Sequence, residues 1–313
     1  MGINTDLKEL GAIIGQNILW TILPLGAVGN SLIIIYFLKI NYVTKLSRMS
    51  LNHFLIIILA VVDLLTSVTT SLIIHQFYKT TWHMGHVMCN VGYPFLMSVL
   101  TFISCWILVL LSYERYRSLT RPFERRATKC KYCVIICVIV LLCWLSFIPF
   151  TLKTRIVEDE DRNTRCADGM RFFDATEYVL YAGFLRMLDC FMPASLMFFF
   201  YARIRNWMNL DANEFPLTDE SRKRNLLALR TLRNLIIVYV VCVFPGRLVV
   251  TGLHIDDNYR TESGLGRIYY FNFVHELFSL ISLLNNVVNV IVYAVMIKDF
   301  RGFILTLVTF GRL

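Results

Sequence analysis

Charged side chains lie inside several stretches of this sequence that are otherwise apolar. Asp63 is surrounded by aliphatic residues, and Arg186, Asp189 and Arg247 lie in two later apolar stretches. Arg186 and Asp189 are three positions apart, a spacing that puts both on one face of a helix. Burying a charge away from water is costly unless another group compensates it. These positions are therefore the first candidates for a functional site.

A second polar group, Glu114-Arg115-Tyr116, closes another long apolar stretch. A guanidinium does not lose its charge and needs acceptors, and the neighbouring Glu114 can supply one. Alternatively, Arg115 only anchors the end of its helix by extending the guanidinium to water. The residues alone leave both roles open.

The composition indicates which elements must hold these residues. Of 313 residues, 57% are hydrophobic and only 17% are charged, and the mean hydropathy is +0.59. This apolar share exceeds the roughly 45–50% of soluble domains, so a soluble globular protein is excluded. With 14% aromatic residues, 15 Gly and 9 Cys, the disordered, collagen-like and disulfide-scaffold classes are excluded too. An integral membrane protein remains.

Stretches long enough to cross a bilayer as helices, about 20 apolar residues each, recur along the chain. We predict an all-α membrane protein, with a seven-transmembrane helix bundle and a short amphipathic eighth helix in a single domain over residues 1–313. The expected spans are 12–38, 50–75, 87–113, 132–152, 178–203, 233–255 and 268–297, and the eighth helix covers 298–308.

Lys and Arg are divided unevenly between the loops on alternate sides of these spans. One side collects 20 of them and the other side 9. Because short loops rich in Lys and Arg stay in the cytoplasm, we predict an extracellular N-terminus and a cytoplasmic C-terminus, in a multi-pass protein of the plasma membrane. The net charge of +9 then reflects topology beside anionic lipid, and nucleic-acid binding is not expected.

Short motifs in all seven expected spans, in the same order, resemble those of the rhodopsin-like (class A) G-protein-coupled receptors. The motifs are Gly29-Asn30, Leu59-Ala60-Val61-Val62-Asp63, Glu114-Arg115-Tyr116, Trp144 with Pro149, Pro193 with Tyr201, Cys242-Val243-Phe244-Pro245, and Asn285-Asn286 with Asn289-Val290-Ile291-Val292-Tyr293. Each string alone is weak evidence, but their joint order is specific. The chain departs from the family at two positions, since Val243 replaces the usual Trp and Val290 the usual Pro.

The resemblance implies a receptor that passes the binding of an extracellular ligand to a heterotrimeric G protein. Arg115 would engage the G protein on activation, and the activation switch would comprise Glu114, Arg115, Tyr116, Tyr201, Pro245, Asn289 and Tyr293. The family's acidic partner for this arginine, at the start of the sixth span, is replaced by Asn225. That replacement predicts a weaker inactive-state lock and raised basal activity.

Two of the cysteines fall on the predicted outer side. Cys89 opens the third span, and Cys166 lies in the loop between the fourth and fifth spans. The resemblance implies a disulfide between them in this oxidising compartment, and two free thiols are the alternative. The other seven cysteines, such as Cys105, Cys137 and Cys242, are interpreted as small buried apolar residues.

The resemblance also groups polar residues around Asp63 in the middle of the membrane. In the family, such a cluster often binds sodium as an allosteric ion, and the residues here would be Asp63, Ser104, Asn285, Asn286 and Asn289. A protonated, neutral Asp63 in a structural hydrogen-bond network is the equal alternative. No other cofactor is expected.

The expected ligand site lies in the outer half of the bundle. Its candidate residues are Met97, Arg186, Asp189, Arg247, His275 and Glu276. Met97 stands where receptors for monoamines carry an aspartate, which disfavours a monoamine, and a peptide is the preferred ligand class. The alternative is that Asp189 and the two arginines only neutralise one another.

The favoured function is thus a G-protein-coupled receptor, with a peptide as the preferred ligand. A seven-span transporter or channel that uses the intramembrane charges is a second hypothesis, which repeat-related halves or discontinuous helices would favour. A receptor fold with weak or no G-protein coupling is a third, suggested by Val243 and Val290. Motifs of hydrolases and phosphate-binding enzymes are absent from the sequence, so no enzymatic activity is expected.

Overall fold

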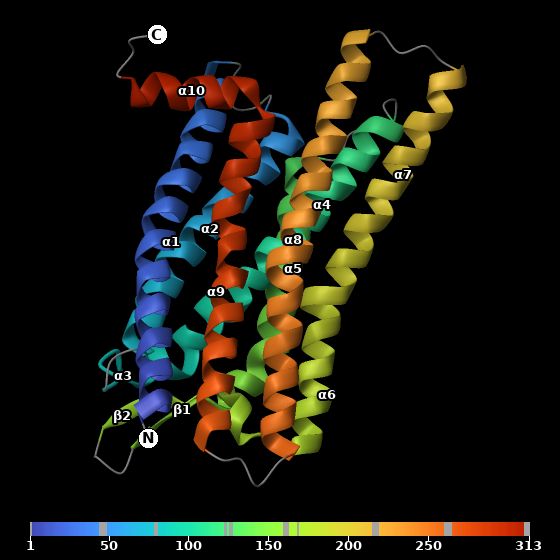
Figure 1. Cartoon of the computed structure of the whole chain (residues 1–313). Helices are drawn as coiled ribbons and strands as arrows, with labels where there is room; N and C mark the ends of the chain where they lie inside the picture. The colour runs from blue at the N-terminus through green and yellow to red at the C-terminus, as the bar shows by residue number, and fades with distance from the viewer. Residues whose placement is uncertain are drawn as a thin grey trace.

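Long helices run side by side along most of the chain (Figure 1). The computed structural model describes residues 2–43, 49–77, 81–121, 124, 128–158, 163–167, 169–214, 219–259 and 265–309. The long helices are α1 (Gly2–Val43), α2 (Leu51–Phe77), α4 (Leu100–Thr120), α5 (Lys129–Lys153), α6 (Ala175–Arg186), α7 (Met192–Glu214), α8 (Asp219–Tyr259) and α9 (Leu265–Met296). The shorter α10 (Lys298–Val308) follows α9 and lies across the end of the molecule opposite the N-terminus.

Two of these helices continue through π-helical turns instead of ending. The short α3 (Gly85–Val87) leads through π-helical segments Met88–Gly92 and Phe95–Val99 into α4. Likewise, the π-helical segment Met187–Phe191 joins α6 to α7. The predicted span 178–203 is therefore one continuous rod with an extra residue in its middle, since a π turn holds more residues than an α turn.

Five helices are long and apolar enough to cross a membrane. Within the described ranges these stretches are Trp20–Tyr42, Leu51–Thr70, Lys129–Lys153, Thr176–Asn209 and Asn225–Val249. The predicted helical membrane protein is confirmed at this level. Among the residues described in full, the predicted spans 87–113 and 268–297 are helical but contain no apolar stretch of this length, and the apolar stretch of α9 there is Leu284–Met296.

Several helices extend well beyond the predicted spans. α1 begins ten residues before position 12, and α8 begins at Asp219, ahead of the predicted start at 233. The first two turns of α8 carry charged residues, such as Lys223, that a search for apolar residues cannot include. The length of an apolar stretch matches the thickness of a bilayer, whereas the helix that contains it can extend beyond the bilayer into water.

A two-stranded hairpin covers the end of the molecule near the N-terminus (Figure 1). Its strands, β1 (Arg155–Glu158) and β2 (Thr164–Ala167), are antiparallel and pair Ile156 with Cys166. Cys166 is bonded to Cys89 with a Cα–Cα distance of 5.6 Å, so the predicted disulfide is confirmed. Trp82 packs on this bridge and its backbone N–H donates to Thr164 O at 2.6 Å. We call this end the hairpin end, and the opposite one the α10 end.

The helices pack through aliphatic and aromatic side chains, with small residues where they approach closely. Fully buried residues such as Ile33, Leu59 and Leu108 form the centre of this core. A Cβ atom added to Gly29 of α1 would lie 2.8 Å from Val290 of α9, so Gly29 allows these two helices to meet. The core therefore requires a small residue opposite the branched side chain of Val290.

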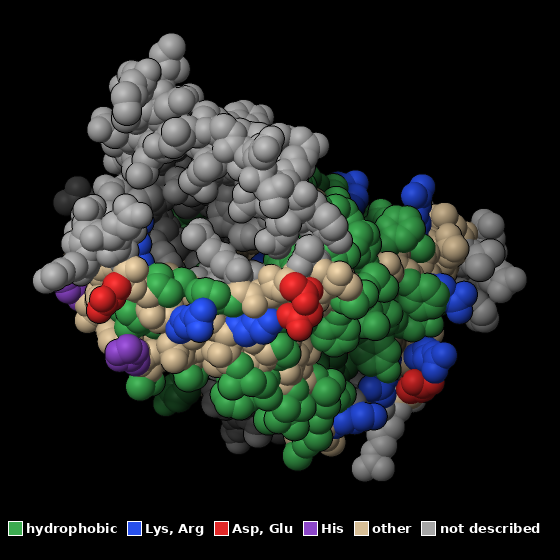
Figure 2. Space-filling model, turned by 90° about the horizontal axis from the view of Figure 1, so that it is seen from below, with side chains coloured by type: hydrophobic (Ala, Val, Ile, Leu, Met, Phe, Trp, Pro, Cys, Tyr) green, Lys and Arg blue, Asp and Glu red, His purple; other side chains and the backbone are tan. Residues whose placement is uncertain are grey.

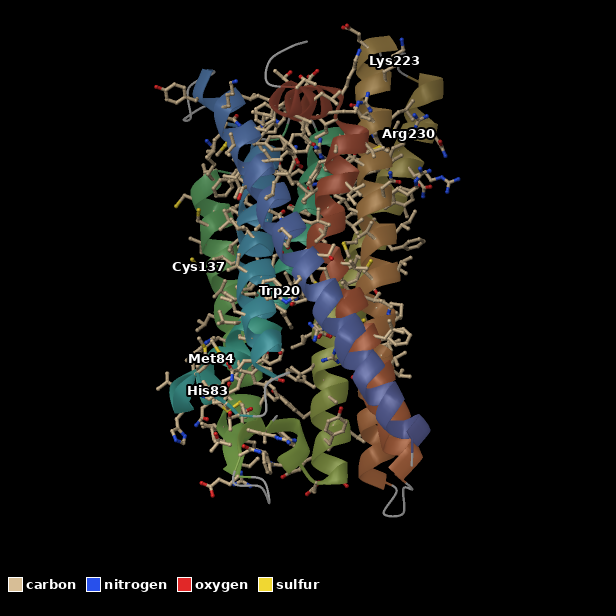
Figure 3. All side chains as sticks on the ribbon, turned by 60° about the vertical axis from the view of Figure 1, so that its left-hand side comes forward. Trp20, His83, Met84, Cys137, Lys223 and Arg230 are labelled. Carbon is tan, nitrogen blue, oxygen red and sulfur yellow. A yellow bond between two sulfur atoms is a disulfide. The ribbon has the colours of Figure 1, made fainter. Side chains whose placement is uncertain are left out.

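The outer surface is apolar as well, which is typical of helices in lipid. Figure 2 shows hydrophobic side chains on much of the described flank, and Figure 3 shows Trp20 on α1, 61% exposed. Only 17% of α5 is buried, which makes it a peripheral helix. Cys130, Cys133 and Cys137 on α5 are exposed, whereas Cys105, Cys143, Cys190 and Cys242 are buried. The interpretation of the remaining cysteines as buried is therefore wrong for α5, because a lipid-facing helix exposes apolar residues.

Candidate functional site

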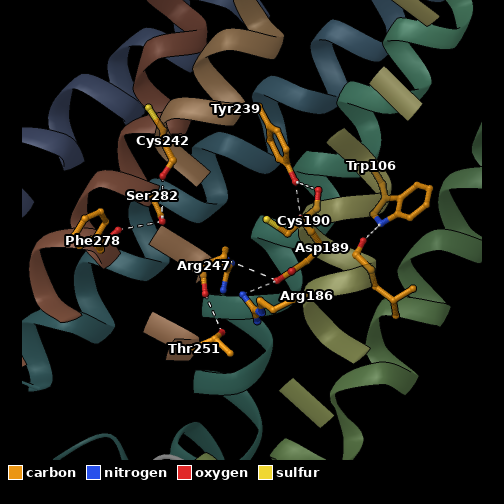
Figure 4. Close-up of polar contacts among 11 residues, drawn as sticks. Trp106, Arg186, Asp189, Cys190, Tyr239, Cys242, Arg247, Thr251, Phe278 and Ser282 are labelled. Atoms are coloured by element: carbon orange, nitrogen blue, oxygen red, sulfur yellow. Dashed lines mark hydrogen bonds and ion pairs between the residues drawn. The ribbon is translucent and has the colours of Figure 1, made fainter. Parts of the chain in front are cut away.

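Three charged residues meet inside the bundle where α6, the π-helical segment and α8 come together. Arg186 Nη1 lies 3.2 Å from Asp189 Oδ2, and Arg247 Nε lies 3.7 Å from the same oxygen. The side chains are 11%, 3% and 21% exposed for Arg186, Asp189 and Arg247 respectively. We call these residues the charged triad (Figure 4). The structure thus brings together three of the predicted ligand residues from two distant parts of the sequence.

The charged triad is held in place by hydrogen bonds to the π-helical segment. A π turn disturbs the regular helical hydrogen bonds, so its carbonyl groups need other donors. Tyr239 Oη of α8 donates to Asp189 O at 2.6 Å and to Cys190 O at 3.2 Å. Trp106 Nε1 of α4 donates to Leu188 O at 3.2 Å. Sequence reasoning missed Tyr239 and Trp106, because their partners are backbone atoms of a distant irregular turn.

Arg247 is positioned by a close approach between α8 and α9. A Cβ added at the preceding residue, Gly246, would lie 2.7 Å from the backbone oxygen of Phe278. Ser282 Oγ of α9 donates to Phe278 O and, at 3.4 Å, to Cys242 O. Cys242 lies three residues before Pro245, in the region where the proline interrupts the regular hydrogen bonding of α8. Ser282 therefore links α9 to α8 one turn from Arg247 (Figure 4).

Charge is not balanced within the charged triad, which has two guanidinium groups and one carboxylate. Neither oxygen of Asp189 has a hydrogen bond of good geometry among the described residues, and Arg186 Nε also lacks one. The three groups therefore attract one another through charge while keeping unused hydrogen-bonding capacity. A buried group in this state can receive a further polar partner, in particular an anionic one.

The remaining predicted ligand residues are placed only by their backbones. Met97 lies in the π-helical segment Phe95–Val99, and His275 and Glu276 lie in α9. Their side chains fall outside the described residues.

Asp63 is fully buried and bonded to two of its predicted partners. Ser104 Oγ donates to Asp63 Oδ1 at 2.7 Å, and Asn289 Nδ2 donates to Asp63 Oδ2 at 2.8 Å. Asn285 and Asn286 are also buried. Asn30 Nδ2 of α1 donates to Asn286 O at 3.0 Å and so connects α1 to this group. We call Asp63, Ser104, Asn285, Asn286 and Asn289 the Asp63 cluster.

The Asp63 cluster has the donor atoms that a small hard cation requires. Among the described residues, the side-chain oxygens of Asn285, Asn286 and Asn289 are buried without hydrogen-bond partners, and Asn289 Nδ2 also donates to the Asp63 carboxylate. Hard cations prefer oxygen ligands, and a single carboxylate suits a single positive charge. No three His, Cys, Asp or Glu gather anywhere in the described ranges, so a transition-metal site is not formed there. The residues therefore fit sodium.

Glu114 is paired with a residue of the next helix and not with its neighbour Arg115. Tyr132 Oη of α5 donates to Glu114 Oε2 at 2.5 Å, and both side chains are buried. No ion pair within 4.0 Å joins Glu114 to Arg115, two residues that the structure describes fully. The expectation that Glu114 supplies an acceptor for Arg115 is wrong in this structure, because the Glu114 carboxylate accepts a hydrogen bond from Tyr132 instead.

The other predicted switch residues lie near the α10 end or between it and the Asp63 cluster. Tyr116 stacks on Phe200 of α7 with ring centroids 5.7 Å apart. Tyr201, the residue after Phe200, is half-buried. Tyr293 is buried, and its hydroxyl has no hydrogen-bond partner in the described part of the chain. Pro245 lies inside α8. The structure places these residues but forms no direct bond between them.

A cavity opens between the start of α2 and the end of α4. Its volume is about 260 Å³, and its lining includes Glu114 and Arg117. On its rim, Arg121 Nη1 donates to Glu124 Oε1 at 2.9 Å. The Glu124 carboxylate raises the pKa of the Arg121 guanidinium above its usual value. This cavity had no signal in the sequence, since its walls come from separate helices.

Apolar helices around buried charges, with a disulfide-tied hairpin at one end, define a multi-pass helical membrane protein. A family model described as 7 transmembrane receptor (rhodopsin family) matches residues 29–293. The chain belongs to this family, so it is a membrane receptor and not an enzyme.

Several named receptors are similar to this chain at 26–27% identity over the aligned residues. The chain is 26% identical to neuropeptide receptor 22 of Caenorhabditis elegans over 212 residues, which are 64% of this chain and 46% of that receptor. It is 27% identical to melanin-concentrating hormone receptor 1 of Sus scrofa over 298 residues, 92% of this chain and 79% of the relative. The Homo sapiens form of the latter matches equally well, at 27% over 300 residues. The chain spans less than half of the nematode receptor.

Proposed function

We propose that this protein is a G-protein-coupled receptor of the plasma membrane whose ligand is a peptide. All seven predicted spans then cross the bilayer, with α10 as an amphipathic eighth helix on the inner surface. The uneven distribution of Lys and Arg supports an extracellular hairpin end and a cytoplasmic α10 end. Figure 3 is consistent with this orientation, since Lys223 and Arg230 lie toward the α10 end of α8.

The ligand site of this proposal comprises the charged triad together with Met97, His275 and Glu276. Two relatives are named for peptide signals, a neuropeptide and melanin-concentrating hormone. The unbalanced positive charge of the triad favours a ligand that brings an anionic group to Arg186 and Arg247. Such a ligand activates the receptor only if it binds the active arrangement more tightly than the inactive one.

The G-protein site of this proposal is Arg115 at the α10 end of α4. Tyr132 keeps Glu114 away from Arg115, and Asn225 of α8 has no carboxylate to offer in its place. Arg115 is thereby available to a partner from the cytoplasm. Tyr116, Tyr201, Pro245, Asn289 and Tyr293 form the rest of the switch, which couples movement of α7 and α8 to the ligand site.

Sodium is proposed as an allosteric ion in the Asp63 cluster. The Asp63 carboxylate and the side-chain oxygens of Ser104 and the three asparagines would hold it. When bound, the ion supplies a positive charge that neutralises Asp63 in the apolar interior. The residues themselves connect α2, α4 and α9, so their bonds to Asp63 favour one arrangement of these helices.

The separation of Glu114 from Arg115, in a chain of this receptor family, is the observation that carries the proposal. Guanine-nucleotide exchange on a panel of heterotrimeric G proteins tests it, in membranes that contain the full chain without ligand. We expect exchange above that of membranes without the receptor. Arg115→Ala should abolish this exchange at matched surface expression.

Arg121→Ala is the matched control, because Arg121 is exposed and binds Glu124 outside the helix. It removes the same charge a turn and a half away and should leave exchange unchanged. Equal exchange by wild type and Arg115→Ala would refute the role of Arg115. No exchange from any of the three, with the protein at the surface, would contradict basal coupling.

A further inference from the structure

Three cysteines of α5 share one exposed face. Cys130, Cys133 and Cys137 are outside any disulfide and exposed. Spacings of three and seven residues return to nearly the same side of an α-helix, because each residue turns the helix by roughly 100°. The three thiols therefore form a row along α5.

The rotation of α5 about its axis is set by Tyr132. Tyr132 is 1% exposed and donates to the buried carboxylate of Glu114 on α4. It follows Cys130 by two positions, roughly 200° around the helix, and so lies on the opposite face. The bond that directs Tyr132 inward consequently directs Cys130 and Cys133 outward.

The outward face of α5 contacts lipid. The most apolar 18-residue stretch of α5 has a mean hydropathy of 2.9, and only 17% of that stretch is buried. Figure 3 shows α5 at the edge of the helix arrangement, with Cys137 on its outward side. Because α5 covers no other described helix on this side, its cysteines project toward the bilayer.

The three cysteines lie at different depths. α5 begins after Thr128, whose side chain caps it by accepting from Lys131 N at 3.3 Å. Lys129 and Lys131 flank Cys130, and such lysines hold their charged ends at the level of the lipid headgroups. With a rise of 1.5 Å per residue, Cys137 lies roughly 10 Å deeper than Cys130 along the helix axis. Cys130 and Cys133 are therefore at the interface and Cys137 is in the hydrocarbon.

We propose that Cys130 and Cys133 are sites of S-acylation by a long-chain fatty acid. Cysteines beside a membrane surface are the residues that carry this reversible modification. Here the thiols are exposed, unpaired, flanked by basic residues and directed into lipid, where an attached chain would lie along α5. The proposal rests on the topology given under Proposed function, which places the start of α5 in the cytoplasm.

The chemistry is an exchange of one thioester for another, with long-chain acyl coenzyme A as the donor. The thiolate of Cys130 or Cys133 attacks the acyl carbonyl, and a new sulfur–carbon bond forms. The coenzyme A thiolate leaves and takes up the proton that the cysteine lost. No group is oxidised or reduced, and hydrolysis of the new thioester restores the thiol.

The positions of the cysteines in the sequence restrict where S-acylation can occur. The predicted cytoplasmic stretches 39–48, 203–233 and 298–313 contain no cysteine. Cys130 and Cys133 are therefore the thiols of this chain that lie at its inner surface, and a label found there can be assigned to them by substitution.

Metabolic labelling of cells that express the full chain tests the proposal. Cells are given an alkynyl analogue of palmitate, the receptor is purified, and the alkyne is coupled to a fluorophore before and after hydroxylamine treatment. We expect label on the wild type that hydroxylamine removes, since it cleaves thioesters. C130S/C133S should fall to background, whereas C137S, the matched control deeper on the same face, should keep the label.

Two outcomes overturn the proposal: an unlabelled wild type, or a C130S/C133S variant with undiminished label. A second measurement separates this failure from failure of the proposed function. After hydroxylamine treatment, Cys130 should react with a membrane-impermeant maleimide only in opened cells. Reaction in intact cells would refute the topology and with it the receptor orientation, whereas protection in intact cells without acyl label refutes S-acylation alone.

Discussion

At the scale of single residues, the partners of Glu114 and Asp63 decide what the structure can do. Glu114 binds Tyr132 of the next helix, which leaves Arg115 without its neighbour's carboxylate. Asp63 binds Ser104 and Asn289, and amide oxygens around it remain unused. The Glu114 carboxylate thus does not pair with Arg115, and the Asp63 carboxylate lies in a site suited to a cation.

Tyr132→Phe should lower basal nucleotide exchange. Loss of the hydroxyl leaves the buried Glu114 without its donor, and a bond to a charged group contributes about 1.5–3 kcal/mol. Glu114 would then turn to Arg115 and occupy it, so we expect exchange to fall several-fold. Tyr113→Phe is the control, since Tyr113 is an exposed neighbour on α4. Unchanged exchange by Tyr132→Phe at matched expression would show that this bond does not govern Arg115.

Sodium should stabilise the purified receptor through Asp63. A ligand that binds only the folded state at ten times its Kd adds about 1.4 kcal/mol. We therefore expect a higher unfolding temperature in sodium chloride than in choline chloride of equal ionic strength, and no difference for Asp63→Asn. Asp299→Asn, at an exposed position of α10, is the control. If wild type unfolds at the same temperature in both salts, the Asp63 cluster is a structural network only.

At the scale of elements, the π-helical segment Met187–Phe191 determines how α6 and α7 contact α8. Its extra residue alters the direction of the side chains that precede and follow it. Arg186 of α6 and Arg247 of α8 both lie within 4 Å of Asp189 in the segment, and Tyr239 of α8 donates to the backbone of the segment. The irregular turn, the charged triad and α8 therefore form one unit.

Tyr239→Phe should destabilise this unit. The variant leaves the buried carbonyl groups of Asp189 and Cys190 without their side-chain donor, which costs about 1–3 kcal/mol. We expect a lower unfolding temperature of the purified protein. Tyr42→Phe, at an exposed end of α1, is the control. Equal unfolding temperatures for wild type and Tyr239→Phe would indicate that the segment needs no donor from α8.

At the scale of the whole molecule, the disulfide joins the hairpin to the helices. Cys89 and Cys166 are 77 positions apart in sequence, and the bridge lies next to Trp82 over one end of the structure. Trp82 N–H also donates to Thr164 O of the hairpin. The bridge therefore fixes the hairpin to the helices at the proposed extracellular end.

Cys89→Ala and Cys166→Ala should each lower the amount of receptor at the cell surface. Loss of such a bridge costs about 2–5 kcal/mol. Because both changes remove the same bond, the double variant should be no worse than either single variant. Cys143→Ala, a buried cysteine without a disulfide, is the control. Additive losses in the double variant would mean that the two thiols act separately.

Much of this architecture could be predicted from the order of residue types along the chain. Apolar length identifies a membrane helix because bilayer thickness sets it, and at five of the predicted spans the structure has a helix long and apolar enough to cross a membrane. The disulfide partners could be named from resemblance, and Arg186 and Asp189 are close because three residues separate them on one helix. These features depend on neighbouring residues in the sequence or on the surrounding bilayer, and not on how the helices pack against one another.

Contacts between distant helices, in contrast, depended on how the helices rotate and approach one another. No spacing in the sequence relates Glu114 to Tyr132, Asp189 to Arg247, or Tyr239 to the carbonyl groups of a π turn. The exposed face of α5 was misjudged for the same reason, since an apolar cysteine suits both a core and a lipid surface. Hydropathy is nearly equal on the two sides of a membrane helix, so only packing decides which side faces inward.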